Sequence, residues 1–352
     1  MILAPKGIAP GGTQLLVGLG GVALLLLPLV LSPYSLLMLG YALVFSIACL
    51  GLNVLFGNTG LFSLGHAAYF GLGAYAGGFI FAFTPVNSLE VYLASGVLTS
   101  TALSVVSGYL CVRATKIHFT ILTLAFAQMV HSLFISGIIF RPFGGVGKGL
   151  FLIGGGGLYI PRFTILGGEL DPSTFERVFY YVIVAAFLGC VCALWRILNS
   201  PFGKALRAIR DNETRAECIG IRVRQYRWYA FIISGFFTGL AGSLFGQWSR
   251  QVTPQQLHWL LSAQLVLATV LGGTRHFLGP VAGAIAFIVF QEVALRFTLH
   301  RSAVLGIILI AAVLVLPGGL AGWATTFSHR MRRRVLRPED KEAEPACGSW
   351  QG

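Results

Sequence analysis

The residues best suited to binding chemistry are polar side chains that interrupt apolar stretches of the sequence. They are Asn53, Ser63, His66, Thr123, Gln128 and His131. Polar groups are costly in lipid and usually face a protein interior or a water-filled path. Gln128 and His131 are three residues apart, so they share one face of a helix. These residues predict either the lining of a solute pathway or hydrogen bonds between packed helices.

Residue patterns typical of catalysis or metal binding are absent from the sequence. Its six cysteines form no C-x-x-C pair near histidine, and it contains neither H-E-x-x-H nor G-x-S-x-G. The run Gly71-Leu-Gly-Ala-Tyr-Ala76 has dinucleotide-binding spacing, but it lies inside an apolar stretch instead of after a strand. Gly147-Lys148-Gly149 lacks the glycine spacing of a P-loop. We therefore expect no cofactor, no metal site and no nucleotide site, and an intramembrane enzyme is disfavoured.

A strongly basic segment, residues 200–228, separates two apolar parts of the chain. Pro201 ends the preceding apolar run, because proline has no amide donor. The apolar residues that follow recur at the spacing of one helix face: Leu206, Ile209, Ala216 and Ile219. Gly220 is the residue type that commonly follows a helix. We expect an amphipathic helix over 203–220, which either lies on anionic lipid or occupies a groove in a cytoplasmic partner.

The composition indicates that these residues belong to a membrane protein. Hydrophobic residues make up 56% of the chain and charged residues only 11%, against about 25% in soluble domains. A membrane-spanning helix needs roughly 20 apolar residues. About ten spans are expected, near 14–32, 36–56, 60–82, 91–111, 118–140, 178–198, 229–248, 257–272, 278–297 and 302–322. The predicted fold is an all-α polytopic membrane protein. Span 257–272 is short enough to be re-entrant, and the glycines between 57 and 71 suit a broken helix.

The charge pattern predicts the orientation of these spans. With an even number of spans and both termini in the cytoplasm, most of the 25 lysines and arginines lie inside, as membrane proteins prefer. The net charge of +13 then needs no nucleic-acid partner. We expect a transmembrane domain over 1–328, with an outer loop at 141–177 and the basic segment inside. Residues 329–352 have the composition of a disordered cytoplasmic tail.

The basic segment resembles the coupling segment of ABC importer permeases in the branched-chain amino acid family. Ser200-Pro-Phe-Gly-Lys-Ala-Leu-Arg-Ala-Ile-Arg210 matches the start of that segment, and Ala216-Glu-Cys-Ile-Gly-Ile221 matches its end. Further stretches agree with the LivM-type subunit: residues 51–75, 123–128, 270–273, 279–284 and 316–320. Because Ser63-Leu-Gly-His66 falls among them, His66 is the strongest candidate for the pathway.

The resemblance implies a non-catalytic permease subunit of an ATP-driven importer in the bacterial inner membrane, carrying branched-chain or related amino acids. The implied partners are separate ABC ATPase subunits, a second homologous permease subunit, a periplasmic substrate-binding protein and membrane lipid. The residues implied to couple the permease to the ATPase are Gly203, Leu206, Arg207, Ile209, Arg210, Ala216 and Gly220.

Departures from the family pattern leave other functions open. Thr274-Arg275-His276-Phe277 replaces a small glycine- and serine-containing link, and residues 143–150 replace a Thr-Gly-Gly-Ser type sequence in the outer loop. Another small polar cargo, such as urea or short amides, therefore remains an alternative. An ion-coupled secondary transporter would need a membrane acid. Glu292 is the acidic residue well inside a predicted span, and its expected role is an ion pair with Arg296.

Overall fold

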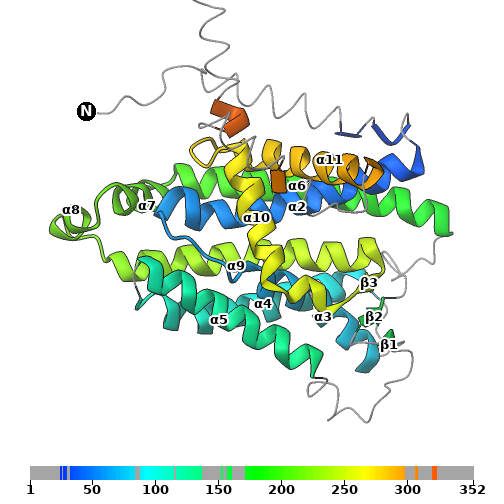
Figure 1. The fold of residues 1–352 in the computed structure, drawn as a ribbon, viewed down its shortest axis with the longest axis horizontal. Coiled ribbons are helices and arrows are strands. Elements are labelled where there is room, and N and C mark those ends of the chain that lie inside the picture. The colour runs from blue at the N-terminus through cyan, green and yellow to red at the C-terminus, as the bar shows by residue number, and fades with distance from the viewer. Residues whose placement is uncertain are drawn as a thin grey trace, which may run out of the picture.

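The computed structural model describes residues 24–25, 27–29, 32–83, 88–114, 116–136, 152–153, 157–160, 171–297, 306–307 and 319–322. Helices dominate these residues (Figure 1). The long and short helices are η1 (Leu27–Leu29), α2 (Pro33–Thr59), α3 (His66–Phe83), α4 (Leu89–Cys111), α5 (Lys116–Ile135), α6 (Pro172–Asn199), α7 (Pro201–Asp211), α8 (Glu213–Cys218), α9 (Val223–Ser249), η3 (Pro254–Leu257), α10 (Trp259–Gly272) and α11 (Gly279–Phe297). The strands are β1 (Leu152–Ile153), β2 (Gly157–Tyr159) and β3 (Gln251–Val252).

The expected spans between residues 36 and 297 each coincide with a helix. Among the described residues, five helices are long and apolar enough to cross a membrane: α2, α4, α5, α6 and α9. α10 and α11 are shorter apolar helices. The prediction of an all-α membrane-spanning fold is therefore confirmed. The expected spans 14–32 and 302–322, and the tail 329–352, fall almost wholly outside the described residues.

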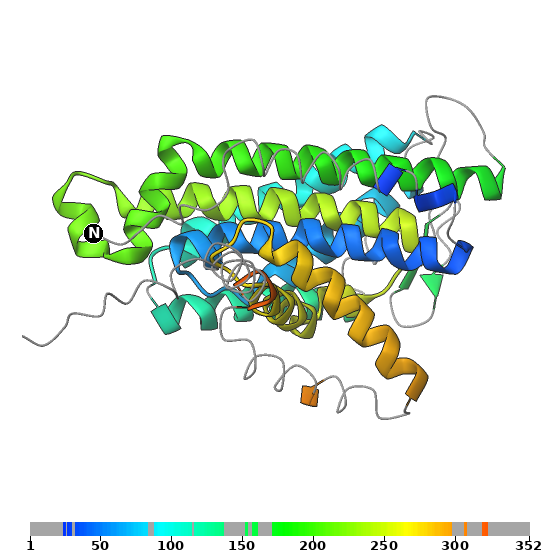
Figure 2. The same ribbon diagram turned by 90° about the horizontal axis from the view of Figure 1, so that it is seen from above.

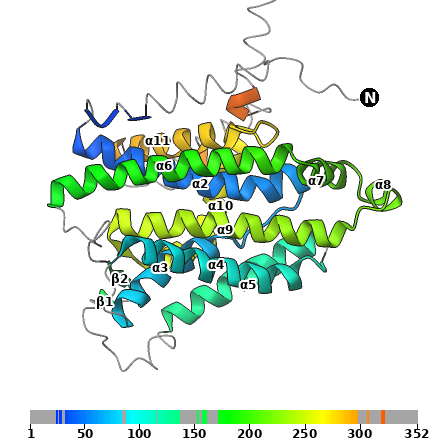
Figure 3. The ribbon, with the colours of Figure 1, turned by 180° about the vertical axis from the view of Figure 1, so that it is seen from behind.

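Helix α9 is the centre of the bundle, since it packs against α2, α3 and α4. In Figures 2 and 3, α2, α6 and α9 run beside one another along the long axis of the molecule. The apolar interior extends over all of these helices and includes the fully buried Ile47, Leu52 and Leu244. α7 and α8 project at one end of the bundle, and the antiparallel sheet β1-β2-β3 lies at the other end (Figure 1).

Small residues allow the central helices to approach backbone to backbone. A β-carbon at Gly242 of α9 would lie 1.9 Å from the carbonyl oxygen of Phe70 in α3. A β-carbon at Gly73 of α3 would lie 2.3 Å from the carbonyl oxygen of Gly239 in α9. Glycines spaced four residues apart are typical of such contacts between membrane helices. The glycine spacing in this sequence therefore serves packing.

The connection between α2 and α3 is the expected broken helix. α2 ends at Thr59, and Gly60 adopts a φ of 74°, which favours glycine. Residues 61–65 are not helical, so the span expected from residue 60 becomes a helix only at His66. The freed backbone groups find partners on α5: Thr120 Oγ1 donates to the Phe62 carbonyl at 2.7 Å, and the Leu64 amide donates to Thr123 Oγ1 at 3.3 Å.

Helix α10 differs from its neighbours in direction as well as in length. It has 14 residues, which is about 21 Å and less than the roughly 30 Å of a hydrocarbon core. In Figure 1 it runs across the long helices instead of along them. The short helix η3 precedes it and begins with a capping box between Thr253 and Gln256. Segment 257–272 is thus a short transverse helix, and its being re-entrant stays a prediction.

Candidate functional site: the basic segment and the bundle interior

The basic segment forms two helices, not the single helix expected over 203–220. α7 begins at Pro201 and ends at Asp211, and α8 covers Glu213–Cys218. Asn212 separates them with an extended backbone, φ −160° and ψ 109°. Its side chain accepts a 3.0 Å hydrogen bond from the Arg215 amide. Asparagine favours such N-caps over a position inside a helix, which explains the break. Gly220, with a φ of 86°, follows the second helix as predicted.

The apolar face of this segment packs on the chain itself. Leu206, Ile209 and Ala216 are 0%, 2% and 1% exposed. Leu206 belongs to the main core, whereas Ile209 and Ala216 form a small cluster with Val223. These three side chains therefore contact the chain itself, and the expectation that the segment occupies a groove in a partner stays a prediction about its other side chains. Ile219, expected on the same face, is 69% exposed, because α8 ends at Cys218 and Ile219 is the cap that follows it.

Helix α7 is fastened to α6 at their junction. Gly203 permits this contact, since a β-carbon there would lie 2.1 Å from the carbonyl oxygen of Leu198. Arg207 donates to the same Leu198 carbonyl at 3.0 Å and to the Gly203 carbonyl at 3.3 Å. Two of the residues implied by the family resemblance thus hold α7 against the end of a long helix.

Helix α7 is also joined to α2 by Arg210. Its Nη1 atom donates to the carbonyl oxygen of Gly57 at 2.6 Å, and the same guanidinium lies 3.2 Å from Asp211. Gly57 belongs to the last turn of α2, where carbonyl groups lack helical partners and attract positive charge. Arg210 therefore caps α2, most of whose residues are buried.

A bidentate ion pair ties α8 to α9. Arg227 donates to the two carboxylate oxygens of Glu213 at 2.6 and 2.8 Å. The Arg227 side chain is 11% exposed and that of Glu213 is 38% exposed. Paired hydrogen bonds of this kind fix geometry as well as charge. Neither residue was among the coupling candidates, although both lie in the basic segment, because the sequence does not show which charges meet.

A polar cavity of about 920 Å³ lies between α7, the end of α2 and the loop after α10. Its lining includes the guanidinium groups of Arg207, Arg210, Arg215 and Arg275, the ring of His276 and the carboxylate of Asp211. Arg275 and His276 come from the stretch that departs from the family pattern. Asn53 also lines the cavity, and its Oδ1 atom is buried without a hydrogen-bond partner among the described residues. This cavity gives the basic segment a concave, positively charged inner surface.

Three of the expected pathway residues stabilise the broken helix. His66 Nε2 lies 2.7 Å from Ser234 Oγ, which in turn donates to the Gly51 carbonyl at 2.7 Å. Ser63 Oγ accepts from the Gly65 amide at 3.3 Å, and Thr123 accepts from Leu64 as described above. Ser63, His66 and Thr123 are each at most 1% exposed. Their contacts are those of a packed interior.

The remaining two residues form a separate pair on α5. Gln128 Nε2 lies 3.4 Å from His131 Nδ1, and the His131 ring contacts that of His258, with centroids 4.9 Å apart. His258 directly precedes α10. The six polar residues therefore fall into three places: the polar cavity beside α7, the broken helix and the contact of α5 with the start of α10.

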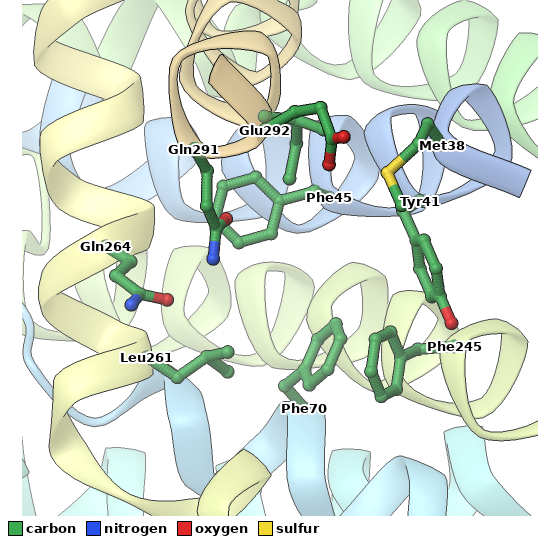
Figure 4. Close-up of a pocket in the computed structure, with 10 residues that line it drawn as sticks. Met38, Tyr41, Phe45, Phe70, Phe245, Leu261, Gln264, Gln291 and Glu292 are labelled. Atoms are coloured by element: carbon green, nitrogen blue, oxygen red, sulfur yellow. The ribbon is translucent and has the colours of Figure 1, made fainter. Parts of the chain in front are cut away.

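Another cavity, of about 280 Å³, is half-open and is lined by none of those six residues. Its walls come from α2, α3, α9, α10 and α11. Figure 4 shows aromatic rings and the polar side chains of Gln264, Gln291 and Glu292 around the same space, with the ring of Phe45 between Gln291 and Glu292. Glu292 accepts a 2.6 Å hydrogen bond from Tyr34. The side chain of Arg296, its expected partner, lies outside the described residues. Sequence reasoning missed both glutamines, whose signal was their polarity within expected spans.

Apolar helices around a solute-sized cavity, with a basic segment fastened to one end of the bundle, define a polytopic membrane permease. Residues 34–313 match the family described as the branched-chain amino acid transport system permease component, and the chain belongs to this family. It is thus an ABC importer permease. In such transporters the permease is not catalytic, a separate subunit hydrolyses ATP, and a binding protein is a general partner.

Curated relatives agree with this assignment over most of the chain. The chain is 27% identical over 341 residues to the high-affinity branched-chain amino acid permease LivM of Escherichia coli, covering 91% of this chain and 79% of the relative. It is 28% identical to LivM of Salmonella typhimurium, over 79% of this chain and 68% of the relative. The guanosine permease NupQ of Bacillus subtilis is 31% identical over 34% of this chain and 36% of its own length. No solved structure matches.

Proposed function

We propose that this chain is a LivM-like subunit that carries branched-chain amino acids across the bacterial inner membrane. The observation that carries the proposal is the family match over residues 34–313, together with LivM relatives that cover most of the chain. A nucleoside is the rival cargo, because NupQ is a guanosine permease of similar sequence. Urea and short amides are further candidates from the departures in the sequence.

We further propose that residues 200–228 receive the movement of the ATPase and pass it to the spans. Arg207, Arg210 and Arg227 support this role, since they connect the segment to α6, α2 and α9. A partner that pushes on the exposed side of α7 and α8 would move three long helices together. The exposed groups available to that partner include Asp211, Arg215 and Ile219.

The proposed assembly contains a second homologous permease subunit and lies in lipid with both termini in the cytoplasm. Exposed apolar side chains on α4 and α5 support burial of these helices in lipid or against that subunit. Leu98 is 68% exposed, Ile117 is 72% exposed and Ile121 is 59% exposed. The basic charge of the segment supports a cytoplasmic position for α7 and α8, and hence for the termini when the number of spans is even.

Uptake by cells that express this permease with its ATPase, partner permease and binding protein tests the cargo. We expect saturable uptake of radiolabelled L-leucine that ends when the ATPase is inactivated and survives collapse of the ion gradient. Preferred uptake of guanosine or urea would overturn the amino acid assignment. Uptake that survives loss of the ATPase but not of the gradient would show a secondary transporter.

Proline at position 208 tests the coupling segment. Position 208 lies inside α7, where proline lacks the amide hydrogen and its ring clashes with the carbonyl of Lys204, at a cost of about 3 kcal/mol. We expect Ala208→Pro to abolish ATP-driven uptake while leaving membrane insertion intact. Lys204→Ala, an exposed change in the same helix that keeps its backbone regular, is the control. Normal uptake by the proline variant would refute the coupling role.

A further inference from the structure

The polar cavity beside α7 contains positive charge that the fold leaves unpaired. Four guanidinium groups and one carboxylate line this space of about 920 Å³. Arg207 and Arg210 already donate to carbonyl groups at the ends of α6 and α2. Within the described part of the chain, the side chains of Arg215, Arg275 and His276, which line the same space, make no hydrogen bond or ion pair. Like charges in one cavity repel each other, so an anion between them lowers the energy of this arrangement.

The unpaired groups come from separate parts of the chain. Arg215 belongs to α8, whereas Arg275 and His276 lie in the connection between α10 and α11. The basic segment packs on other elements, since α7 contacts α2, α6 and α9, and α8 contacts α9. The cavity therefore lies between the basic segment and the connection that precedes α11. An anion that contacts Arg215 and Arg275 at the same time would join these two parts of the chain.

A buried amide of the cavity also lacks a partner. Asn53 lines the cavity and is 3% exposed, and its Oδ1 atom makes no hydrogen bond among the described residues. Buried polar atoms without a partner are uncommon in native proteins, so each indicates a water or a ligand. Rotation of the carboxamide exchanges its oxygen and its NH2 group. Asn53 can therefore donate to an oxyanion, or accept from a hydroxyl group of that anion.

The type of cation in the cavity selects among anions. A guanidinium group matches phosphate, because two parallel N–H groups reach two of its oxygens at once. Phosphate has further oxygens for a second guanidinium group, so Arg215 and Arg275 can bind it from two sides. A volume of about 920 Å³ lies near the upper end of ligand cavities. The cavity thus has room for a phosphate group and for the molecule to which it is attached.

We propose that this cavity binds a phosphate group, and that the bound phosphate fastens the basic segment to the connection between α10 and α11. The phosphate belongs to a soluble anion or to the headgroup of a phospholipid, which present the same oxygens. Arg275 and His276 lie where this sequence departs from the small link of the family pattern, so the site is a feature of this particular chain. The inference adds a ligand to the proposed coupling segment and does not depend on which solute the permease carries.

Binding to the purified complete transporter tests the site in maltoside micelles, which contain no phosphate. Inorganic phosphate is titrated in one arm, and phosphatidylglycerol is added in the other. We expect saturable binding of at least one probe, with a Kd about tenfold higher in Arg275→Gln and in Arg215→Gln, because each variant loses a charge-assisted contact. Arg222→Gln is the matched control and is expected to bind as the parent does, since Arg222 is an exposed arginine of the basic segment outside this cavity.

Hydrogen exchange tests the bridge separately from binding. With the probe bound, the backbone amides of α8 are expected to exchange more slowly in the parent and at an unchanged rate in Arg275→Gln. Because Arg275 lies outside the basic segment, a bridge through the phosphate explains why its loss affects those amides. Binding of a probe that leaves the exchange of α8 unchanged in the parent would refute the bridge.

The two arms identify the source of the phosphate. Arginine-dependent binding of inorganic phosphate alone supports a soluble anion, and arginine-dependent binding of phosphatidylglycerol alone supports a lipid headgroup. Absence of binding by both probes would refute the site, as would an equal loss of binding in Arg222→Gln. If neither probe binds and Arg275→Gln loses its ATPase subunits on purification, the cavity accepts an acidic group of that partner instead, and the phosphate site is likewise refuted.

Discussion

Arg210 donates a 2.6 Å hydrogen bond from Nη1 to the carbonyl oxygen of Gly57, although 153 residues separate them. The bond joins a short polar helix to the last turn of α2, whose residues from Ala42 to Leu55 are buried. Asp211 holds the same guanidinium from the other side at 3.2 Å. A displacement of α7 therefore acts on the end of a rigid helix in the core.

Arg210→Gln tests this connection. Glutamine keeps a donor but is too short and uncharged to cap α2, so the favourable interaction with the helix terminus, about 0.3–1 kcal/mol, is lost. If each transport cycle requires this contact to move α2 together with α7, we expect leucine uptake to fall at least about tenfold. ATPase activity of the assembled transporter, measured beside uptake, is expected to persist and so to show uncoupling.

The control for that variant is Arg222→Gln. Arg222 is an exposed arginine of the same segment, and no side-chain hydrogen bond is recorded for it among the described residues. An equal loss of uptake in Arg210→Gln and Arg222→Gln would mean that the positive charge of the segment matters in general, and that the contact with Gly57 does not. Normal uptake by Arg210→Gln would likewise contradict a role for this contact.

The Glu213–Arg227 pair is expected to respond unequally to loss of either partner. Glu213→Ala leaves a guanidinium that is 11% exposed without its carboxylate, whereas Arg227→Ala leaves a carboxylate that is 38% exposed and can hydrate. Breaking a buried pair costs about 3–5 kcal/mol, and the exposure of Glu213 lowers this to about 2 kcal/mol. Thermal unfolding of the detergent-solubilised protein is expected to show a lower Tm for Glu213→Ala than for Arg227→Ala. The reverse order would contradict this account of burial.

Asn212 is expected to determine the shape of the basic segment. Asn212→Ala removes the acceptor for the Arg215 amide, and loss of such a cap costs about 1 kcal/mol. Without the cap α7 can continue into α8, which turns Glu213 away from Arg227. We expect reduced uptake at normal abundance, with recovery in Asn212→Asp because aspartate also caps helices. A cross-link between cysteines introduced at Glu213 and Arg227 measures the change directly, and unchanged cross-linking in Asn212→Ala would exclude it.

The sequence predicts the helices of this protein better than it predicts the contacts between them. The apolar runs located α2 to α6 and α9 to α11, because burial in lipid leaves a signal that is local in the sequence. The break at Asn212 was not predicted, because Leu206, Ile209 and Ala216 keep a helical spacing across it. The break depends on the capping preference of a single residue, and that signal is weaker in the sequence than the spacing. The pairs Arg210–Gly57 and Arg227–Glu213 join distant or differently oriented helices, so no local pattern predicts them.

The sequence also did not predict where the cavities lie or which residues line them. His66 was the preferred pathway residue, yet it is buried against Ser234 in the packed interior. Gln264 and Gln291 line the same cavity only because α10 runs across the bundle and the chain then turns back into α11. The short length of span 257–272 indicated an unusual segment, but the direction of a helix follows from tertiary packing.

The contact of α3 with α9 gives a prediction about stability with a close control. Gly242→Ala places a methyl group 1.9 Å from the Phe70 carbonyl oxygen, so the two backbones must separate. Overpacking of this kind costs about 1–3 kcal/mol. Gly189→Ala in α6 has nothing within 4 Å of the added carbon, and alanine is favoured over glycine inside a helix. We expect a lower Tm and reduced abundance for Gly242→Ala and an unchanged or higher Tm for Gly189→Ala. Equal stability of the two variants would contradict the close approach of these helices.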